Sequence, residues 1–592
     1  MKFVVVFLLI GSFIVKANEI NYSVGTIGIC DYATPQQALD AINAKNVPGK
    51  RAGVDNYHLR LVAETFADGF YISDKDEFKL TGGYENCLAA ENMIREPGSQ
   101  SIIDGNGSVA MALLNNNPEN IQMHVTGLKV INGISGGFFP SGGLNVAGNL
   151  DVIIRESTFE NNNSLWGGGI YAGENTYLRM VETMVINNDA TFGGGIYCTD
   201  CILTLSTDSG ITDNHSIENG GGIFMNNGSS LSLFSGSDNP LLDDFGVHNN
   251  VAGQLGGGIF IEQSSAVLYG FAFNGNGDDI NPVSVTHNTA LQGGGIYAVT
   301  ANVNSALLNL SNNKASQAGA GVSLNVNSSF NLDILDPLDV PFTSCWNHNK
   351  SKCNLIQNNI IQNGAATGAH GGAFDVNDSI LKVEYTWFEG NDAGGQGDGA
   401  ALAFNSINPG SRIDQSVFHN NGYPTGDDNS MIYLSTFSNI SVRQNTWTDN
   451  NISQALVQIE DSGSGIDLRN SVISNLNGDT VLDYPAMANV SAECMLTHES
   501  TSFPPPPATN NVWQGDPMFY NRAGDDFRVL GASVTTIDRC APIVGLDVVD
   551  LAMQNRQHDV ENLANDDSNY VDTGAYEYQG ISPDVIFIDG FE

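Results

Sequence analysis

The sequence predicts an all-β fold in which the chain winds into a parallel solenoid, because two short motifs recur in phase through its middle. One motif is a glycine cluster followed by an apolar pair, as in Gly167–Tyr171, Gly193–Tyr197 and Gly220–Phe224. The other is an apolar residue, two further residues and then asparagine, as in Phe159 to Asn162. The first three glycine clusters start 26 and 27 residues apart. Repetition with a period of about 20 to 50 residues is typical of repeat architectures.

The period favours short strands over helices. The segments between the motifs are rich in Val, Ile, Leu, Phe and Tyr and are separated by Gly, Asn, Asp and Ser, which is typical of strands and turns. Helical repeats are longer, at about 33 to 47 residues. A coil of about 26 residues accommodates three strands and three turns, and successive coils stack about 4.8 Å apart. Equivalent residues are therefore expected to form columns along the solenoid axis.

The asparagine motif predicts one such column. Stacked side-chain amides hydrogen bond to one another from strand layer to strand layer. We therefore expect a ladder of hydrogen-bonded asparagines that stabilises the coils. Its expected members are Asn162, Asn188, Asn214, Asn250, Asn288, Asn313, Asn363, Asn391, Asn421, Asn450 and Asn475.

The paired motifs also resemble a known repeat. Phe388–Asn391 followed by Gly397–Ala400, and Val285–Asn288 followed by Gly293–Ile296, are similar to the repeat of the chlamydial polymorphic outer-membrane proteins. The resemblance covers roughly residues 120–480. It implies a right-handed parallel β-helix of the pectin-lyase-like class.

Both ends of the chain carry sequence features that differ from the repeat. Lys2, the apolar run from Phe3 to Val15 and the small residue Ala17 predict a signal peptide over residues 1–17, with an uncleaved anchor as the alternative. We expect an N-terminal cap over 18–55, with a short helix that has Thr34 as its N-cap. The predicted β-helix covers 56–480, followed by a C-terminal cap module over 481–580 and a tail over 581–592.

The C-terminal part resembles the choice-of-anchor module of bacterial β-helix surface proteins. The resemblance is carried by Asp516–Phe519, Gly524–Leu530 and Asp572–Glu577. It implies secretion, with retention at the cell surface as one outcome. We therefore expect a secreted protein or one associated with the bacterial cell surface or outer membrane.

The eight cysteines predict disulfides, because an even number behind a secretory signal is typical of oxidised proteins. Proximity in the sequence suggests the pairs Cys198–Cys201 and Cys345–Cys353, which leaves Cys30–Cys87 and Cys494–Cys540. For Cys198 and Cys201, a redox or zinc pair is the alternative.

Charge limits the possible partners. The 65 acidic and 23 basic residues give a formal net charge of -42. Nucleic acids are excluded as natural partners, because phosphate binding depends on clustered Lys and Arg. The apolar run from Phe3 to Val15 is short for a membrane-spanning helix, which needs about 20 residues, and no later stretch is long and uncharged enough to be one. We expect a monomer without a cofactor or a defined metal site.

Candidate catalytic residues lie in acidic insertions. We expect three consecutive units to carry insertions after the glycine cluster, over residues 236–244, 273–282 and 333–340, and these insertions to stack on one side. Their acidic residues are Asp238, Asp243, Asp244, Asp278, Asp279, Asp333, Asp336 and Asp339. Paired carboxylates cleave glycosidic bonds, and carboxylates and carbonyls also bind calcium. Asp243, Asp244, Asp278 and Asp279 are the catalytic candidates; solvated acidic loops are the alternative.

The sequence leaves two functions open. The first is a binding or adhesin-like role toward a glycan or cell-surface partner. The second is a polysaccharide lyase or glycoside hydrolase that uses the acidic loops. Three histidines, His248, His287 and His419, lie within the asparagine turns and are expected to point outward.

Overall fold

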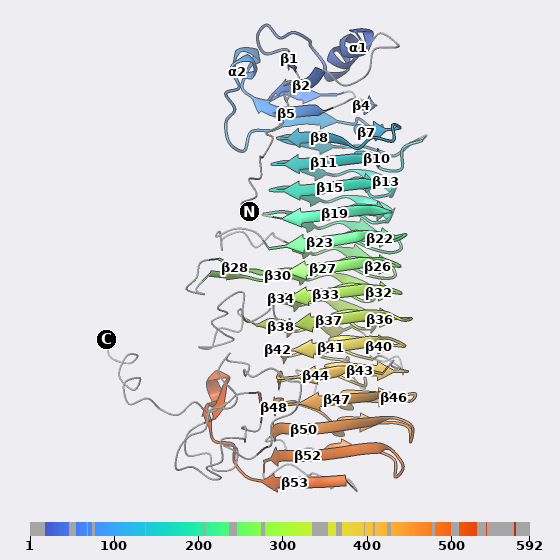
Figure 1. Cartoon of the computed structure of the whole chain (residues 1–592), viewed down its shortest axis with the longest axis vertical. Helices are drawn as coiled ribbons and strands as arrows, with labels where there is room; N and C mark the ends of the chain where they lie inside the picture. The colour runs from blue at the N-terminus through green and yellow to red at the C-terminus, as the bar shows by residue number, and fades with distance from the viewer. Residues whose placement is uncertain are drawn as a thin grey trace, which may run out of the picture.

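The computed structural model shows an all-β parallel β-helix whose coils stack in chain order along one long axis (Figure 1). The structure describes residues 18–45, 55–67, 69–73, 77–136, 138–206, 208–235, 246–273, 279–333, 353–362, 370–395, 397–406, 409–422, 428–475, 480–498, 508–529, 540 and 574–575. The predicted signal peptide and the predicted tail lie outside these residues.

Three parallel sheets form the coils in the described part of the chain. The large sheet has 30 strands and contributes two strands to most coils, the second sheet has 14 and the third has seven. The second sheet consists of β4 (Phe70–Ser73), β7 (Met111–Asn115), β10 (Leu144–Gly148), β14 (Ile170–Ala172), β18 (Ile196–Thr199), β22 (Ile223–Asn226), β26 (Ile259–Glu262), β32 (Ile296–Val299), β36 (Val322–Asn325), β40 (Phe374–Asn377), β43 (Leu402–Asn405), β46 (Ser430–Ser435), β49 (Ala455–Ile459) and β51 (Thr480–Asp483). The third sheet consists of β13 (Asn163–Trp166), β17 (Asp189–Phe192), β21 (His215–Ser216), β25 (Val251–Ala252), β31 (Thr289–Gln292), β35 (Lys314–Ala318) and β39 (Ile360–Ile361).

The large sheet begins at the N-terminal end of the described chain and continues to β53. Its strands are β1 (Asn18–Val24), β2 (Asp55–Val62), β3 (Thr65–Phe66), β5 (Phe78–Tyr84), β6 (Ser101–Asp104), β8 (Ile121–Thr126), β9 (Leu128–Ile131), β11 (Leu150–Arg155), β12 (Thr158–Glu160), β15 (Thr176–Val181), β16 (Met184–Ile186), β19 (Cys201–Ser206), β20 (Gly210–Thr212), β23 (Ser230–Phe234), β24 (Gly246–His248), β27 (Ser265–Tyr269), β30 (Val283–Thr286), β33 (Asn302–Ala306), β34 (Leu308–Ser311), β37 (Ser329–Asp333), β38 (Asn354–Gln357), β41 (Ile380–Glu384), β42 (Thr386–Glu389), β44 (Arg412–Asp414), β45 (Val417–His419), β47 (Asn439–Arg443), β48 (Thr446–Thr448), β50 (Gly465–Ser474), β52 (Asn489–Thr497) and β53 (Ala508–Gln514).

The core is a set of apolar columns. Leu144, Ile170, Ile196 and Ile223 are register partners on consecutive strands of the second sheet, and all four are fully buried. Because successive residues of a strand point to opposite faces, the neighbour of each of these residues points outward. The repeat therefore produces one continuous core and, at the same time, one outward column.

The glycine clusters form a tight corner. The first glycine has a left-handed φ, as at Gly167 and Gly193, both at 64°. The second glycine lies against the next coil: a Cβ added to Gly194 would be 2.4 Å from the carbonyl oxygen of Gly221. Glycine fits this close approach in most coils, and a methyl group is accommodated in two later ones, at Ala320 and Ala400, both fully buried.

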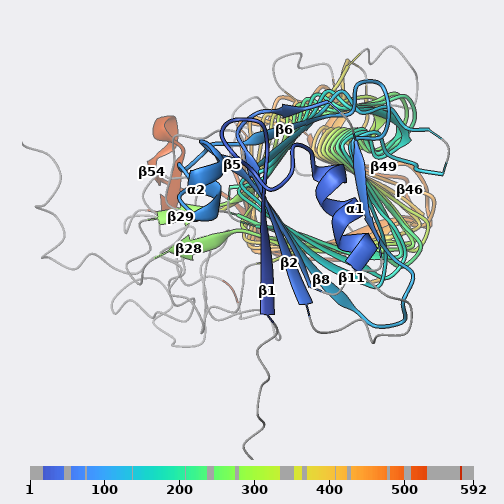
Figure 2. The same cartoon turned by 90° about the horizontal axis from the view of Figure 1, so that it is seen from above.

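The N-terminal end is covered by helix α1 (Pro35–Lys45), which lies across the end of the coil in Figure 2. Ala38, Leu39 and Ile42 of this helix are buried in the core cluster. The Thr34 hydroxyl accepts a hydrogen bond from the backbone N–H of Gln37 at 3.3 Å. Strand β1, which lies within the predicted cap, pairs in parallel with β2.

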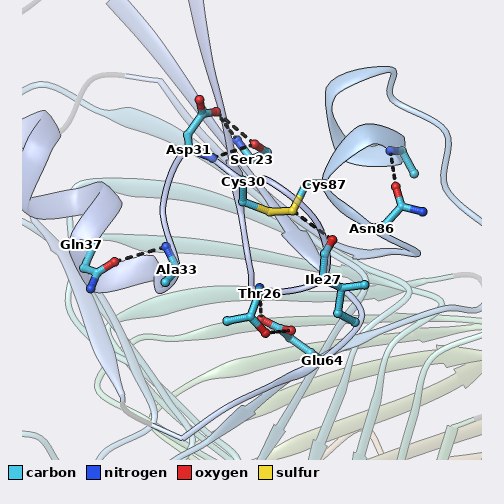
Figure 3. Close-up of a disulfide and its surroundings, with 11 residues drawn as sticks. Ser23, Thr26, Ile27, Cys30, Asp31, Ala33, Gln37, Glu64, Asn86 and Cys87 are labelled. Atoms are coloured by element: carbon cyan, nitrogen blue, oxygen red, sulfur yellow. Dashed lines mark hydrogen bonds between the residues drawn. A yellow bond between two sulfur atoms is a disulfide. The ribbon is translucent and has the colours of Figure 1, made fainter.

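A disulfide joins this end to helix α2 (Cys87–Glu91). Cys30 is bonded to Cys87 (Figure 3), and the backbone N–H of Cys87 donates to the carbonyl of Ile27 at 3.0 Å. Thr26 lies in the same turn as Ile27 and Cys30, and its backbone N–H and its hydroxyl both donate to the Glu64 carboxylate at 2.8 Å. The turn from residue 26 to 30 is thus tied to the first coils.

Parallel pairing continues past residue 480, although the sequence repeat ends there. Strand β52 pairs with β50, and β53 pairs with β52. The chain then forms an antiparallel pair, β54 (Phe519–Asn521) and β55 (Asp526–Val529), around the short helix η2 (Arg522–Gly524). The stacked coils therefore extend into the predicted C-terminal module.

Candidate functional site

The asparagines form a buried ladder on the inside of one turn. From Asn162 to Asn421, each asparagine donates its backbone N–H and its side-chain amide to Oδ1 of the next, at 2.9 to 3.2 Å. The ladder runs through Asn162, Asn188, Asn214, Asn250, Asn288, Asn313, Asn359, Asn391, Asn421, Asn450 and Asn475.

One expected rung was misplaced. Asn359, and not Asn363, bonds to both Asn313 and Asn391. The correct unit starts at Ile356, which is in register with Leu310 in the preceding coil. A second apolar residue four positions later, Ile360, produced the false match. Asn363 itself lies outside the described residues.

The acidic insertions leave the large sheet at the same corner, between its two strands in a coil. They follow β23, β27 and β37. The units are not consecutive, because β33 leads through Leu307 alone to β34. Gly293 and Gly319 are only 26 residues apart, which leaves no room for an insertion in that coil.

Six of the eight acidic residues in the insertions lie outside the described part of the chain. They are Asp238, Asp243, Asp244, Asp278, Asp336 and Asp339. Asp279 begins β29 (Asp279–Asn281), which pairs antiparallel with β28 (Phe271–Phe273), and Asp333 ends β37.

Disulfides join Cys198 to Cys201 and Cys494 to Cys540, in addition to Cys30–Cys87. The Cys198–Cys201 disulfide links β18 to β19, which argues against a zinc pair. Cys353 is also disulfide-bonded, and Cys345 lies outside the described residues.

Two of the three turn histidines, which were expected to point outward, are buried by neighbouring parts of the molecule. His248 is 7 % exposed, and its Nδ1 lies 2.6 Å from the Thr286 hydroxyl. His419 is 4 % exposed because Phe527 of the C-terminal segment covers its ring, with centroids 5.1 Å apart. Both residues point away from the core, but other parts of the molecule cover them.

The outward column of the second sheet is an aromatic stack that the sequence analysis missed. Its five rings come from consecutive coils, and neighbouring centroids are 4.7 to 5.7 Å apart with interplanar angles of 5 to 18°. The rings are Tyr171, Tyr197, Phe224, Phe260 and Tyr297. The signal was present, since each ring directly follows the buried isoleucine of a glycine motif and strand residues alternate between faces.

The inner rings cover one another and present little surface to a ligand. Phe224 is 6 % exposed and Phe260 is 5 % exposed. The stack ends at Tyr171, because the next residues in the column are Asn145 and Ala112. The face of the terminal tyrosine is therefore not covered by another ring of the column.

A hollow of about 540 Å³ lies at this end of the stack. Its walls combine Tyr171, Trp166 and Leu165 with the loop that precedes β10 and with residues of β7 and β10. The remaining lining residues are Leu114, Ser135, Gly136, Phe138, Phe139, Pro140, Asn145 and Ala147.

The wall contains an unusual concentration of exposed apolar side chains. Phe138 is fully exposed, Leu165 is 46 % exposed and Trp166 is 38 % exposed. Contiguous apolar surface of this kind marks binding sites more often than it marks inert surface. The lining also includes amide and hydroxyl groups, and none of the lining residues is charged.

The loop over the hollow is held in place by the asparagine ladder and by its own hydrogen bonds. Gly133 N–H donates to Oδ1 of Asn162 at 2.8 Å, so the first rung fixes the start of the loop. Asn145 is buried, and its side chain both accepts from and donates to the backbone of Ser141 at 2.8 Å. The hollow is therefore largely preformed, as ligand pockets usually are.

The other end of the aromatic stack is acidic. Ser323 and Asp375 follow Tyr297 in the same column. Burial raises the pKa of Asp375 to about 7, and the Asn377 amide donates to its carboxylate at 2.6 Å. This carboxyl group is nearly inaccessible, at 4 % exposure, so we assign it a structural role.

Among the described residues, no helix has the length and apolar character needed to cross a membrane. No protein-family model matches the sequence, and no curated protein is significantly similar to it.

Proposed function

We propose that the protein is an extracellular β-helix that binds a neutral glycan in the hollow beside Tyr171. The single observation that carries the proposal is the uncharged, aromatic-lined hollow at the open end of the ring stack. Its volume of about 540 Å³ lies within the usual range of small-molecule pockets. Binding of a glycan on another cell would give the protein the adhesin-like role that the sequence predicts.

The chemistry of the wall supports a sugar as the ligand. The two faces of a pyranose ring carry C–H groups that pack on aromatic faces, while its hydroxyl groups need hydrogen-bonding partners. Trp166 and Tyr171 offer aromatic surface, and the side chain of Ser135 lies in the same wall. A chain with a net charge of -42 repels acidic polysaccharides, which favours a neutral glycan.

The proposed location is outside the cytoplasm. Three disulfides among the described residues are compatible with an oxidising compartment. The predicted leader over residues 1–17, the similarity to polymorphic outer-membrane protein repeats and the similarity to the choice-of-anchor module support secretion or display on a bacterial surface. The partner would then be a glycan on a neighbouring or host cell.

The test is a glycan array followed by calorimetry with the mature protein and Trp166→Ala. We expect neutral oligosaccharides to bind and the variant to bind at least tenfold more weakly. Tyr177→Ala is the matched control, because Tyr177 is an aromatic residue on β15 of the large sheet, outside the hollow. Binding that is unchanged in Trp166→Ala, or an array with only acidic hits, would refute the proposal.

A polysaccharide lyase or hydrolase is the second candidate. The observation that favours it is the shared corner from which the insertions after β23, β27 and β37 leave the coils. Incubation with acidic and neutral polysaccharides, with and without calcium, tests it through release of reducing ends or unsaturated products. Activity that Asp278→Ala abolishes would support the enzyme over the binding protein.

A further inference from the structure

We propose that Glu389, His419 and Asp525 bind a divalent transition-metal ion that fastens the C-terminal segment to the side of the β-helix. One ligand atom from each residue lies within 4.8 Å of the others. The three side chains come from three elements: β42, β45 and the turn between η2 and β55. The proposal is independent of the glycan-binding hollow.

The two β-helix ligands are fixed by the register of the coils. Glu389 and His419 are partners in the parallel pairing of β42 with β45, so their side chains leave the same face one coil apart. Asp525 approaches from outside, and its Oδ1 lies 3.1 Å from Nε2 of His419. The cluster therefore forms only when the C-terminal segment is docked.

The orientation of the imidazole is that of a metal ligand. Nδ1 of His419 lies 3.3 Å from the backbone carbonyl oxygen of Thr448, which only accepts hydrogen bonds. Nδ1 therefore donates to this carbonyl, and Nε2 lies 3.1 Å from Oδ1 of Asp525. Histidines that bind metals typically hold the second ring nitrogen in this way against a backbone carbonyl or a carboxylate.

Charge also favours a cation. Two carboxylates and one imidazole carry a net negative charge whether or not the imidazole is protonated. The side chain of Asp525 is 32 % exposed and that of His419 is 5 % exposed, so water screens the two carboxylates only partly, and a cation between them relieves their repulsion. The nearby Arg522 donates instead to the Asp449 carboxylate, at 2.6 and 3.0 Å.

The ligand set indicates the class of metal. An imidazole nitrogen with carboxylate oxygens suits zinc and related first-row ions better than calcium, which takes oxygen ligands. The side-chain amide of Asn420 lies 2.7 Å from Nε2 of His419, so Asn420 can supply a further oxygen if its amide is rotated. Zinc–ligand distances of about 2.1 Å require the ligands to close in slightly around the ion.

The consequence is a metal-dependent clamp. Phe527 stacks on Trp387 with ring centroids 5.6 Å apart, and Arg522 holds Asp449 on the neighbouring coil. These contacts dock residues 519–529 without metal. A bound ion stabilises the docked state further, because the undocked state lacks the Asp525 ligand.

The experiment uses the full mature protein after treatment with EDTA. Calorimetry and elemental analysis with zinc alone should show one ion per chain. Tryptic cleavage after Arg522 and Arg528, followed by mass spectrometry, reports on undocking. If undocking limits cleavage, its rate should fall about 100-fold when free zinc is at 100 times its Kd.

Isosteric variants separate a metal site from a simple ion pair. Asp525→Asn and Glu389→Gln should lose the stoichiometric zinc and the zinc-dependent protection while the coils stay folded. Asp449→Asn is the matched control. It removes the carboxylate partner of Arg522, which lies on the same C-terminal segment as Asp525, so basal cleavage should rise while zinc uptake remains. Absence of zinc binding below about 100 µM, or equal uptake by the two ligand variants, would overturn the proposal in favour of a metal-free ion pair.

Discussion

The side-chain amide of Asn188 donates to Oδ1 of Asn214 at 3.0 Å, and the backbone N–H of Asn188 donates to the same oxygen at the same distance. The amide of Asn188 also donates to the carbonyl of Phe159. One side chain thus bonds to the coil before it and to the coil after it. The same geometry recurs along the ladder. The asparagine turn, which has little apolar content, therefore stabilises the coils through buried hydrogen bonds.

Removing a rung should be costly, and Asn359→Ala tests both the cost and the assignment. The change removes the partner of the Asn313 backbone N–H and of the Leu310 carbonyl, whereas the Asn313 amide keeps its bond to the carbonyl of Val285. At about 1 to 3 kcal/mol for each buried unsatisfied group, we expect a loss of at least about 2 kcal/mol. Urea unfolding followed by circular dichroism measures it.

The control for this rung is its neighbour. Asn358 has a φ of 52°, which glycine adopts readily, so Asn358→Gly should change stability by less than about 1 kcal/mol. If the two variants unfold at the same urea concentration, the ladder does not carry the stability assigned to it.

The aromatic stack should divide into a stabilising middle and a ligand-binding end. Phe224→Ala removes a buried ring between two stacked neighbours, and we expect a loss of about 3 kcal/mol. Tyr171→Ala should cost less, because one face of its ring has no stacking partner in the column, yet it should weaken glycan binding. Thermal unfolding and calorimetry on both variants check the division; stronger destabilisation by Tyr171→Ala would contradict it.

Asp375 should make the protein less stable as the pH rises from 4 to 7. Burial raises its pKa from 3.8 to about 7, so between these values the folded state binds more protons than the unfolded state. Stability contributed by this group therefore falls with rising pH, by about 1.4 kcal/mol for each unit of pKa difference at most. Asp375→Asn, which stays neutral, should be more stable than the native protein at pH 8.

The comparison at low pH is the internal control for Asp375. At pH 4 the native carboxyl is already protonated in the folded state, so the asparagine variant should gain much less there. Urea midpoints measured across this range decide the matter. A constant difference between the two proteins at all pH values would show that Asp375 does not titrate as proposed.

The Cys30–Cys87 disulfide should stabilise the N-terminal end. It links residues 57 positions apart, and the chain-entropy argument assigns such a loop about 4 kcal/mol. The double variant Cys30→Ser/Cys87→Ser should expose residues 18–45 to hydrogen exchange at lower temperature. Exchange in the central coils, around β22 and β26, should change little, because their contacts are local to the solenoid.

The repeat in the sequence determined the parallel β-helix and ten of the eleven rungs, because a buried amide column needs asparagine at the same place in every coil. The cysteine positions, independently of the repeat, predicted three of the disulfides. Cys198–Cys201 followed from proximity in the sequence, and Cys30–Cys87 and Cys494–Cys540 were the pairs that remained. The one misplaced rung, Asn359, shows the limit of reasoning from the repeat. Two apolar residues four positions apart, Ile356 and Ile360, satisfy the same pattern, and only pairing with Leu310 identifies the residue in register.

Tertiary structure alone decided the features that bear on function. The hollow beside Tyr171 lies where the column of rings gives way to Asn145 and Ala112 in the preceding coils. Its remaining walls come from the loop with Phe138 and from Trp166 of the third sheet. The approach of Asp525 to Glu389 and His419 joins residues more than a hundred positions apart, after the repeat has ended. Local periodicity specifies what repeats, whereas binding sites arise where the repeat is interrupted and distant segments meet.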